Sequence, residues 1–114
     1  MRGYREQVIS ETFDAEAAAA RVAGEMLPLA DATRAAQEKR YLKSDLDFLG
    51  VSVPGIRQAV TETARSHPGL PRDSALAWAR ALWREPVHER RTAAIEVLTR
   101  VSALGGDAVA GPGS

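Results

Sequence analysis

The chain has 114 residues and no cysteine, and its 15 basic residues balance 15 acidic ones, with 45% hydrophobic and 26% charged positions. This size and composition fit one globular domain with a modest core and exclude a disulfide framework or a cysteine-based zinc site. No stretch reaches the roughly 18 uncharged apolar residues of a membrane span, and the charged start lacks the apolar segment of a signal peptide, so a cytoplasmic protein is expected.

The charges are unevenly distributed along the chain. Residues 1–38 contain four Arg and seven acidic residues, whereas residues 39–100 contain eleven Lys and Arg and seven acidic residues. The excess of cations that begins at Lys39 is compatible with a face directed at a polyanion, and equally with an ordinary solvated helix surface.

Helix-forming patterns dominate the first half of the chain. The run "DAEAAAARVAGEML" predicts a first helix with Asp14 as its N-cap and with Val22, Met26 and Leu29 on its apolar stripe. A second helix is expected through "RAAQEKRYLK", capped by Asp31 or Thr33. It is predicted to end near residues 48–50, where Gly50 suits a left-handed C-cap.

Two prolines mark the later helices. Pro54 is expected to open a third helix and Pro86 a fifth, because the first turn of a helix tolerates the missing N–H of proline. The third helix carries a regular apolar or small face, and the fifth is expected to do the same. The third face consists of Ile56, Ala59, Val60, Thr63, Ala64 and His67, and the fifth consists of Ala94, Val97, Leu98 and Val101.

A fourth helix is predicted over residues 73–84, with Leu76, Ala79, Leu82 and Trp83 buried. Trp78 and Trp83 are five residues apart and cannot both lie at the centre of one face, so Trp83 is assigned to the core and Trp78 to the flank. The predicted fold class is therefore all-α: about five helices in antiparallel pairs over residues 1–104, followed by a flexible Gly-rich tail over residues 105–114.

Few residues indicate a reactive centre. No Gly-rich phosphate loop is present, and neither His67 nor His88 has a second ligand at helical spacing. We therefore predict no metal site and no cofactor. Asp45 and Asp47 lie near a chain corner, where capping or solvation is the simpler interpretation.

Two stretches carry a more specific pattern. The run "YLKSDLDFLGVSVPGIRQAV" and, after the next helix, "ALWREPVHERRTAAIEVL" together resemble the N-terminal part of the DNA alkylation repair family, the HEAT-like alkylpurine DNA glycosylases. The resemblance covers about residues 30–100. It implies an incomplete HEAT-like α-solenoid whose concave basic face holds double-stranded DNA, and an activity that hydrolyses the glycosidic bond of N3- or N7-alkylated purines.

The resemblance also implies roles for particular residues. Tyr41 matches a tyrosine that lies near the lesion in the family, and Arg40, Lys43 and Arg57 are candidates for contact with DNA phosphates. Phe48, Leu49 and Pro54 would form the packed corner that fixes this face. No residue of the chain corresponds to the family's catalytic aspartate or its lesion-flanking tryptophans. Asp107, in a Gly-rich stretch, is not assigned to catalysis.

We therefore expect an N-terminal piece of a glycosylase, from an interrupted reading frame or a shortened chain, which is inactive alone and binds DNA weakly without sequence preference. Two alternatives stay open: a non-enzymatic helical module that binds DNA or protein, and a helical dimerisation domain. Each repeat of a solenoid covers the apolar face of its neighbour, so the last repeat of an incomplete solenoid leaves its own face uncovered. We therefore also expect self-association through Val97, Val101 and Leu104.

Overall fold

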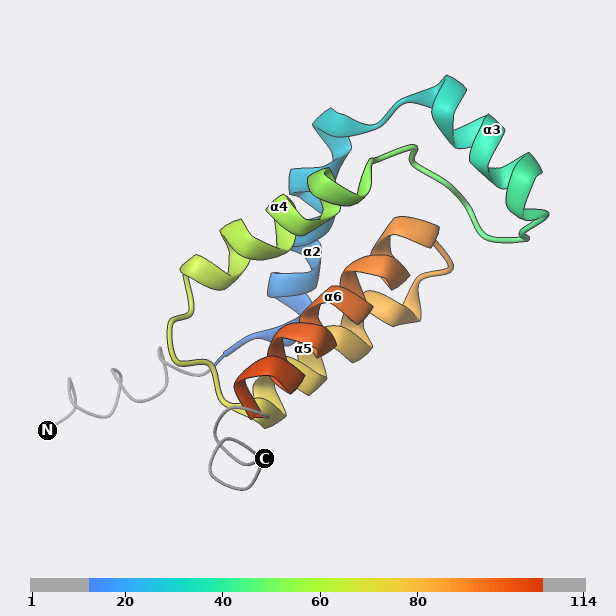
Figure 1. Ribbon diagram of the computed structural model, residues 1–114. Helices are drawn as coiled ribbons and strands as arrows, with labels where there is room; N and C mark the ends of the chain where they lie inside the picture. Colours follow the sequence, from blue (N-terminus) through green and yellow to red (C-terminus); the bar gives the residue numbers. More distant parts are fainter. Residues whose placement is uncertain (1–12, 106–114) are drawn as a thin grey trace, which may run out of the picture.

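The computed structural model describes residues 13–105, with side chains through Val101. This part of the chain has no β-strand beyond one isolated bridge, so the predicted all-α fold with about five helices is confirmed. The helices, shown in Figure 1, are α2 (Ala15–Met26), the short 3-10 helix η1 (Leu27–Leu29), α3 (Ala32–Leu42), α4 (Val53–Arg65), α5 (Arg72–Arg84) and α6 (His88–Gly105).

Side-chain caps fix where several helices begin. The carboxylate of Asp14 accepts a hydrogen bond from the N–H of Ala17 at 3.0 Å, which confirms the predicted cap of α2. The hydroxyl of Ser52 accepts from the N–H of Gly55 at 3.2 Å, and Pro54 lies in the first turn of α4, as predicted. These caps satisfy N–H groups that have no partner inside the helix.

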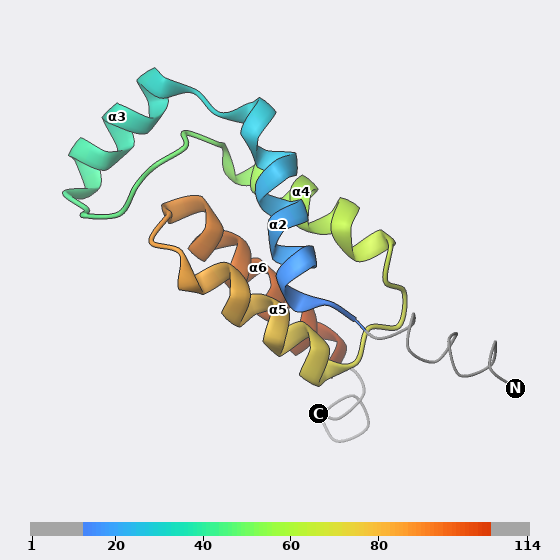
Figure 2. The same cartoon turned by 180° about the vertical axis from the view of Figure 1, so that it is seen from behind.

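Four of the helices, α2, α4, α5 and α6, pack around one core. Figures 1 and 2 show α2 antiparallel to α4, and α5 antiparallel to α6, with the two pairs laid against each other. This is the layout of consecutive helix pairs in an α-solenoid. The largest fully buried side chains are Trp78, Met26, Ile56, Leu82, Glu89, Val22, Val60, Val97 and Thr63.

The two tryptophans exchange their predicted places. Trp78 is 2% exposed and lies in the core, whereas Trp83 is 46% exposed. Trp78 shares one helical face with Ala75, Ala79 and Leu82, all of which are buried. Asp73, Arg80 and Arg84 lie on one side of α5, and the apolar residues fill a broad arc opposite them. Trp78 lies near the centre of this arc and Trp83 near its edge, so the charged residues indicate the inward face. The assignment of Trp83 to the core was wrong.

Other predicted core positions also differ. Leu29 and Leu98 are 45% and 40% exposed, while the remaining stripe residues of α2, Val22 and Met26, are fully buried. In α6, Ala94 and Val97 are buried and Val101 is half-buried against the core. The prediction that Pro86 opens this helix was wrong by two residues: α6 begins at His88, and the carbonyl of Pro86 accepts from the N–H of Asp47 instead of from the helix.

The end of α3 is set by an unexpected residue. The helix stops at Leu42, and Lys43 takes the left-handed conformation with φ 50°, where the sequence predicted Gly50 as the C-cap. Gly50 has φ 80° but lies in the segment that returns from α3 to the bundle.

Most of the predicted tail, residues 106–114, lies outside the described residues. None of the described helices combines the length and apolarity of a membrane span.

Candidate nucleic-acid interface

Helix α3 and the segment that returns from it form a projection, residues 31–51, which we call the α3 arm. Figure 1 shows this arm extending beyond one end of the four-helix bundle. Not one residue of α3 is buried. The arm is therefore held by its ends and by polar contacts rather than by an apolar face.

Polar contacts give the arm its shape. The carboxylate of Asp31 accepts from the N–H of Arg34 at 2.9 Å, so Asp31 rather than Thr33 caps α3. At the other end, the N–H of Lys43 donates to the carbonyls of Lys39 and Arg40 in the last turn of α3. The ammonium of Lys39 donates to the carbonyl of Leu46 and thereby ties the returning segment to the helix.

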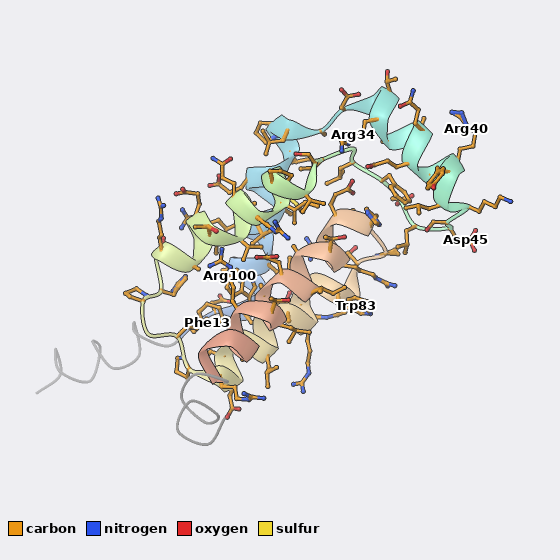
Figure 3. The ribbon with its side chains drawn as sticks, in the orientation of Figure 1. Phe13, Arg34, Arg40, Asp45, Trp83 and Arg100 are labelled. Atoms are coloured by element: carbon orange, nitrogen blue, oxygen red, sulfur yellow. The ribbon has the colours of Figure 1, made fainter. Side chains whose placement is uncertain are left out.

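Three of the four predicted DNA-binding residues come together at the tip of this arm. Arg40 and Tyr41 lie in the last turn of α3, and Lys43 is its C-cap. Tyr41 is 84% exposed, and neither Arg40 nor Lys43 forms an ion pair with another residue of the described part of the chain. In Figure 3 the side chain of Arg40 points away from the bundle. The tip therefore presents two cations and an aromatic ring to solvent.

The fourth predicted residue, Arg57, lies apart from the tip, on α4. Its guanidinium forms an ion pair with Glu96 of α6 at 3.4 Å. Glu96 also lies 3.7 Å from the guanidinium of Arg100. This cation already has an anionic partner, which lowers its availability to a phosphate compared with Arg40 or Lys43.

The base of the arm is fastened to the start of α6. The N–H of Asp47 donates to the carbonyl of Pro86 at 3.0 Å, and the N–H of His88 donates to the carbonyl of Asp47 at 2.8 Å. The rings of Phe48 and His88 stack with centroids 4.5 Å apart and planes 13° from parallel. In the predicted packed corner, Leu49 packs against the core as expected, whereas Phe48 is only half-buried and contacts His88 instead of the core.

A residue that the sequence analysis missed completes this junction. The carboxylate of Glu89, which is fully buried, accepts hydrogen bonds from the N–H groups of Leu49, Gly50 and Val51. A glutamate in the first turn of a helix usually faces solvent, where it complements the helix dipole. No local sequence signal distinguishes Glu89 from that ordinary case, because its partners lie about forty residues earlier in the chain.

A second exposed surface lies between α5 and α6. A hollow of about 410 Å³ is lined by Leu76, Ala79, Arg80, Trp83, Ala94 and Leu98. The guanidinium of Arg91 lies 4.9 Å from the centroid of the Trp83 ring, close enough for a cation–π contact.

The residues predicted to mediate self-association differ in exposure. Val97 is buried in the core and cannot contribute, and Val101 is half-buried. The side chain of Leu104 lies outside the described side chains.

The acidic residues near the arm are either exposed or already hydrogen-bonded. Asp45 and Asp47 are both exposed, and Glu89 is buried with its oxygens already bonded to backbone N–H groups. Within the described residues, no three His, Asp or Glu side chains are grouped as metal ligands would be. The described carboxylates near the arm are thus solvated or held by backbone N–H groups, beside the exposed cations of the tip.

Comparison with known proteins adds one finding. A family model described as DNA alkylation repair enzyme matches residues 22–108, which span most of the chain and include the whole α3 arm. A search of curated proteins and a search of solved structures each found no match.

Proposed function

Because the chain belongs to the DNA alkylation repair enzyme family, we propose that it contacts double-stranded DNA through the tip of the α3 arm. The observation that carries this proposal is the grouping of Arg40, Tyr41 and Lys43 at the end of a helix that projects from the bundle, where they are exposed and have no ion pair with an acidic residue among residues 13–105. Arg40 and Lys43 would contact phosphates, and the ring of Tyr41 would face the base pairs. Such contacts give weak, salt-sensitive binding without sequence preference.

The proposal is tested by replacing the two cations together. We expect Arg40→Ala with Lys43→Ala to weaken binding of a fluorescein-labelled duplex in anisotropy titrations. The slope of log K against log salt should fall by about 0.9 for each phosphate that the protein no longer neutralises. The matched control is Arg21→Ala with Arg65→Ala, which removes the same charge from cations paired with Glu25 and Glu62. Equal losses of affinity in both double variants would show that only net charge matters.

Arg57 provides a graded comparison. Since its guanidinium is already paired with Glu96, Arg57→Ala is expected to weaken DNA binding less than Arg40→Ala. A larger loss of affinity for Arg57→Ala in the same titration would move the proposed DNA contact from the arm to the surface of α4 and α6.

A more specific proposal concerns the repair reaction in which the protein takes part. We propose that the protein acts within alkylpurine repair of the glycosylase type, while the residues of this chain supply DNA contact rather than bond cleavage. Hydrolysis of a glycosidic bond needs an anionic group placed against the developing positive charge on the sugar. Asp45 and Asp47 are solvated, and Glu89 is buried and fully engaged. These carboxylates are poorly placed for that role.

We therefore expect the chain alone to release no 7-methylguanine or 3-methyladenine from methylated DNA above the spontaneous rate. Release measured by chromatography, and abolished by Asp45→Asn or Asp47→Asn, would contradict this expectation and identify the catalytic carboxylate.

A second candidate function is association of two copies through the hollow between α5 and α6. The exposed ring of Trp83 lies beside a recess whose lining includes the small, buried residues Ala79 and Ala94. The same face therefore carries a projecting side chain and a recess that can receive one. Such a face can pair with itself about a two-fold axis. Sedimentation equilibrium tests this: a dimer that Trp83→Ala converts to monomer supports it, and a monomeric wild-type chain rejects it.

A further inference from the structure

Glu89 is a buried carboxylate held entirely by backbone N–H groups. One of its oxygens accepts from Leu49 at 2.9 Å, and the other accepts from Gly50 at 2.9 Å and from Val51 at 3.2 Å. No ion pair joins Glu89 to a cation within the described part of the chain. Burying a carboxylate is unfavourable unless such bonds replace its water, so the three donors and the acceptor depend on one another.

The three donors form a corner, residues 49–51, whose opposite side supports α3. The N–H of Asp31, the cap of α3, donates to the carbonyl of Leu49 at 2.9 Å. The backbone of α3 also comes so close to Gly50 that an added Cβ would lie 2.0 Å from the carbonyl oxygen of Asp31. The corner is therefore bound by Glu89 on one side and by the first turn of α3 on the other.

Few other contacts determine the direction in which α3 projects. The helix buries no side chain. Within the described residues, the arm is also attached to the bundle by the Asp47 backbone bonds, by the Phe48–His88 stack, and by Leu49 and Val51, which pack against or within the core. The backbone bonds and the ring stack meet residues 86–88, directly before Glu89, so this junction at the start of α6 contributes to the orientation of the arm, with Glu89 as its buried polar component.

We propose that Glu89 is a positioning residue for the DNA contact: it does not reach nucleic acid, but it fixes the corner that orients Arg40, Tyr41 and Lys43. This role rests on the proposed function of the arm. It requires that loosening the corner weakens DNA binding although no residue at the tip has changed.

The test uses Glu89→Gln in the full chain, with Glu62→Gln as the matched control. Both variants remove one negative charge, which by itself strengthens binding to a polyanion. We expect Glu62→Gln to bind a labelled duplex as well as or better than wild type. Glu89→Gln should bind at least several-fold more weakly, and the exchange protection of the Leu49, Gly50 and Val51 amides should fall by NMR.

A double-mutant comparison adds a readout that general destabilisation does not give. If Glu89 acts through the tip, Arg40→Ala with Lys43→Ala should reduce affinity less in the Glu89→Gln background than in wild type. Glu89→Asp, which keeps the charge but shortens the reach, serves as the second variant if Glu89→Gln does not fold. It should show the same changes to a smaller degree.

Several outcomes overturn the proposal. Unchanged amide protection in Glu89→Gln would show that the carboxylate does not hold the corner. Reduced protection with unchanged or improved affinity would show that the corner does not orient the DNA contact. A wild-type chain without DNA affinity would reject the proposed function and this role with it, whereas the exchange measurement would still report whether Glu89 anchors the corner.

Discussion

The bundle and the α3 arm are both helical, but different forces hold them. The bundle buries an apolar face from each of α2, α4, α5 and α6, while α3 buries no residue. The segment that returns from α3 is attached through backbone hydrogen bonds, a ring stack, one carboxylate and the packing of Leu49 and Val51 at its end. Burial of apolar surface provides most of the stability of a folded domain. Helix α3 itself therefore adds little to global stability, which leaves the tip of the arm available for function.

The largest contrast should come from truncating one leucine in each region. Leu82 is fully buried in the bundle, and Leu42 is 50% exposed at the end of α3. We expect Leu82→Ala to lower the free energy of unfolding by about 2–5 kcal/mol, because it removes buried apolar surface and leaves a cavity. Leu42→Ala should change it by less than about 0.5 kcal/mol. Urea denaturation followed by circular dichroism measures both, and equal losses of stability would refute the distinction.

A pair of glycines tests where the two regions join. Gly50 has φ 80°, and a Cβ there would meet the backbone of α3, whereas a Cβ on Gly24 in α2 would meet nothing within 4 Å. Gly50→Ala is expected to cost at least about 1–2 kcal/mol from its backbone conformation alone. Gly24→Ala should stabilise the protein by up to about 1 kcal/mol, since alanine favours helices. Denaturation midpoints that shift in the same direction would contradict this assignment.

The helix caps give the smallest effect and the finest comparison. Asp14 caps α2 in the bundle, and Asp31 caps α3 in the arm, each by accepting one backbone N–H. Replacement of either with alanine removes about 1 kcal/mol of helix stabilisation. For Asp14→Ala this loss should appear in global unfolding. For Asp31→Ala it should appear as faster amide exchange within α3, with a nearly unchanged denaturation midpoint. A full loss of global stability in Asp31→Ala would show that α3 unfolds with the bundle.

Much of the fold could be predicted from local sequence. The Asp14 cap, the Pro54 start of α4 and the apolar face of Ile56, Ala59 and Val60 depend on neighbours within a few residues, and the structure confirms them. The resemblance of "YLKSDLDFLGVSVP" to a repair family was likewise readable from the chain, and the family match bears it out.

Tertiary structure decided what spacing left open. The apolar arc of α5 is broad enough to include both tryptophans, and packing against α2 and α6 buries Trp78 and leaves Trp83, at the edge of the arc, exposed. The candidate site was also only partly predictable. The grouping of Arg40, Tyr41 and Lys43 follows from their closeness in sequence, whereas the ion pair that distinguishes Arg57 from them is with Glu96, which is distant in sequence. Glu89 was the least predictable residue, because the N–H groups that make its burial possible come from a corner far away in the chain. Caps and helix faces are short-range properties of the chain, whereas the choice of buried face and the partners of a buried charge depend on how distant segments pack.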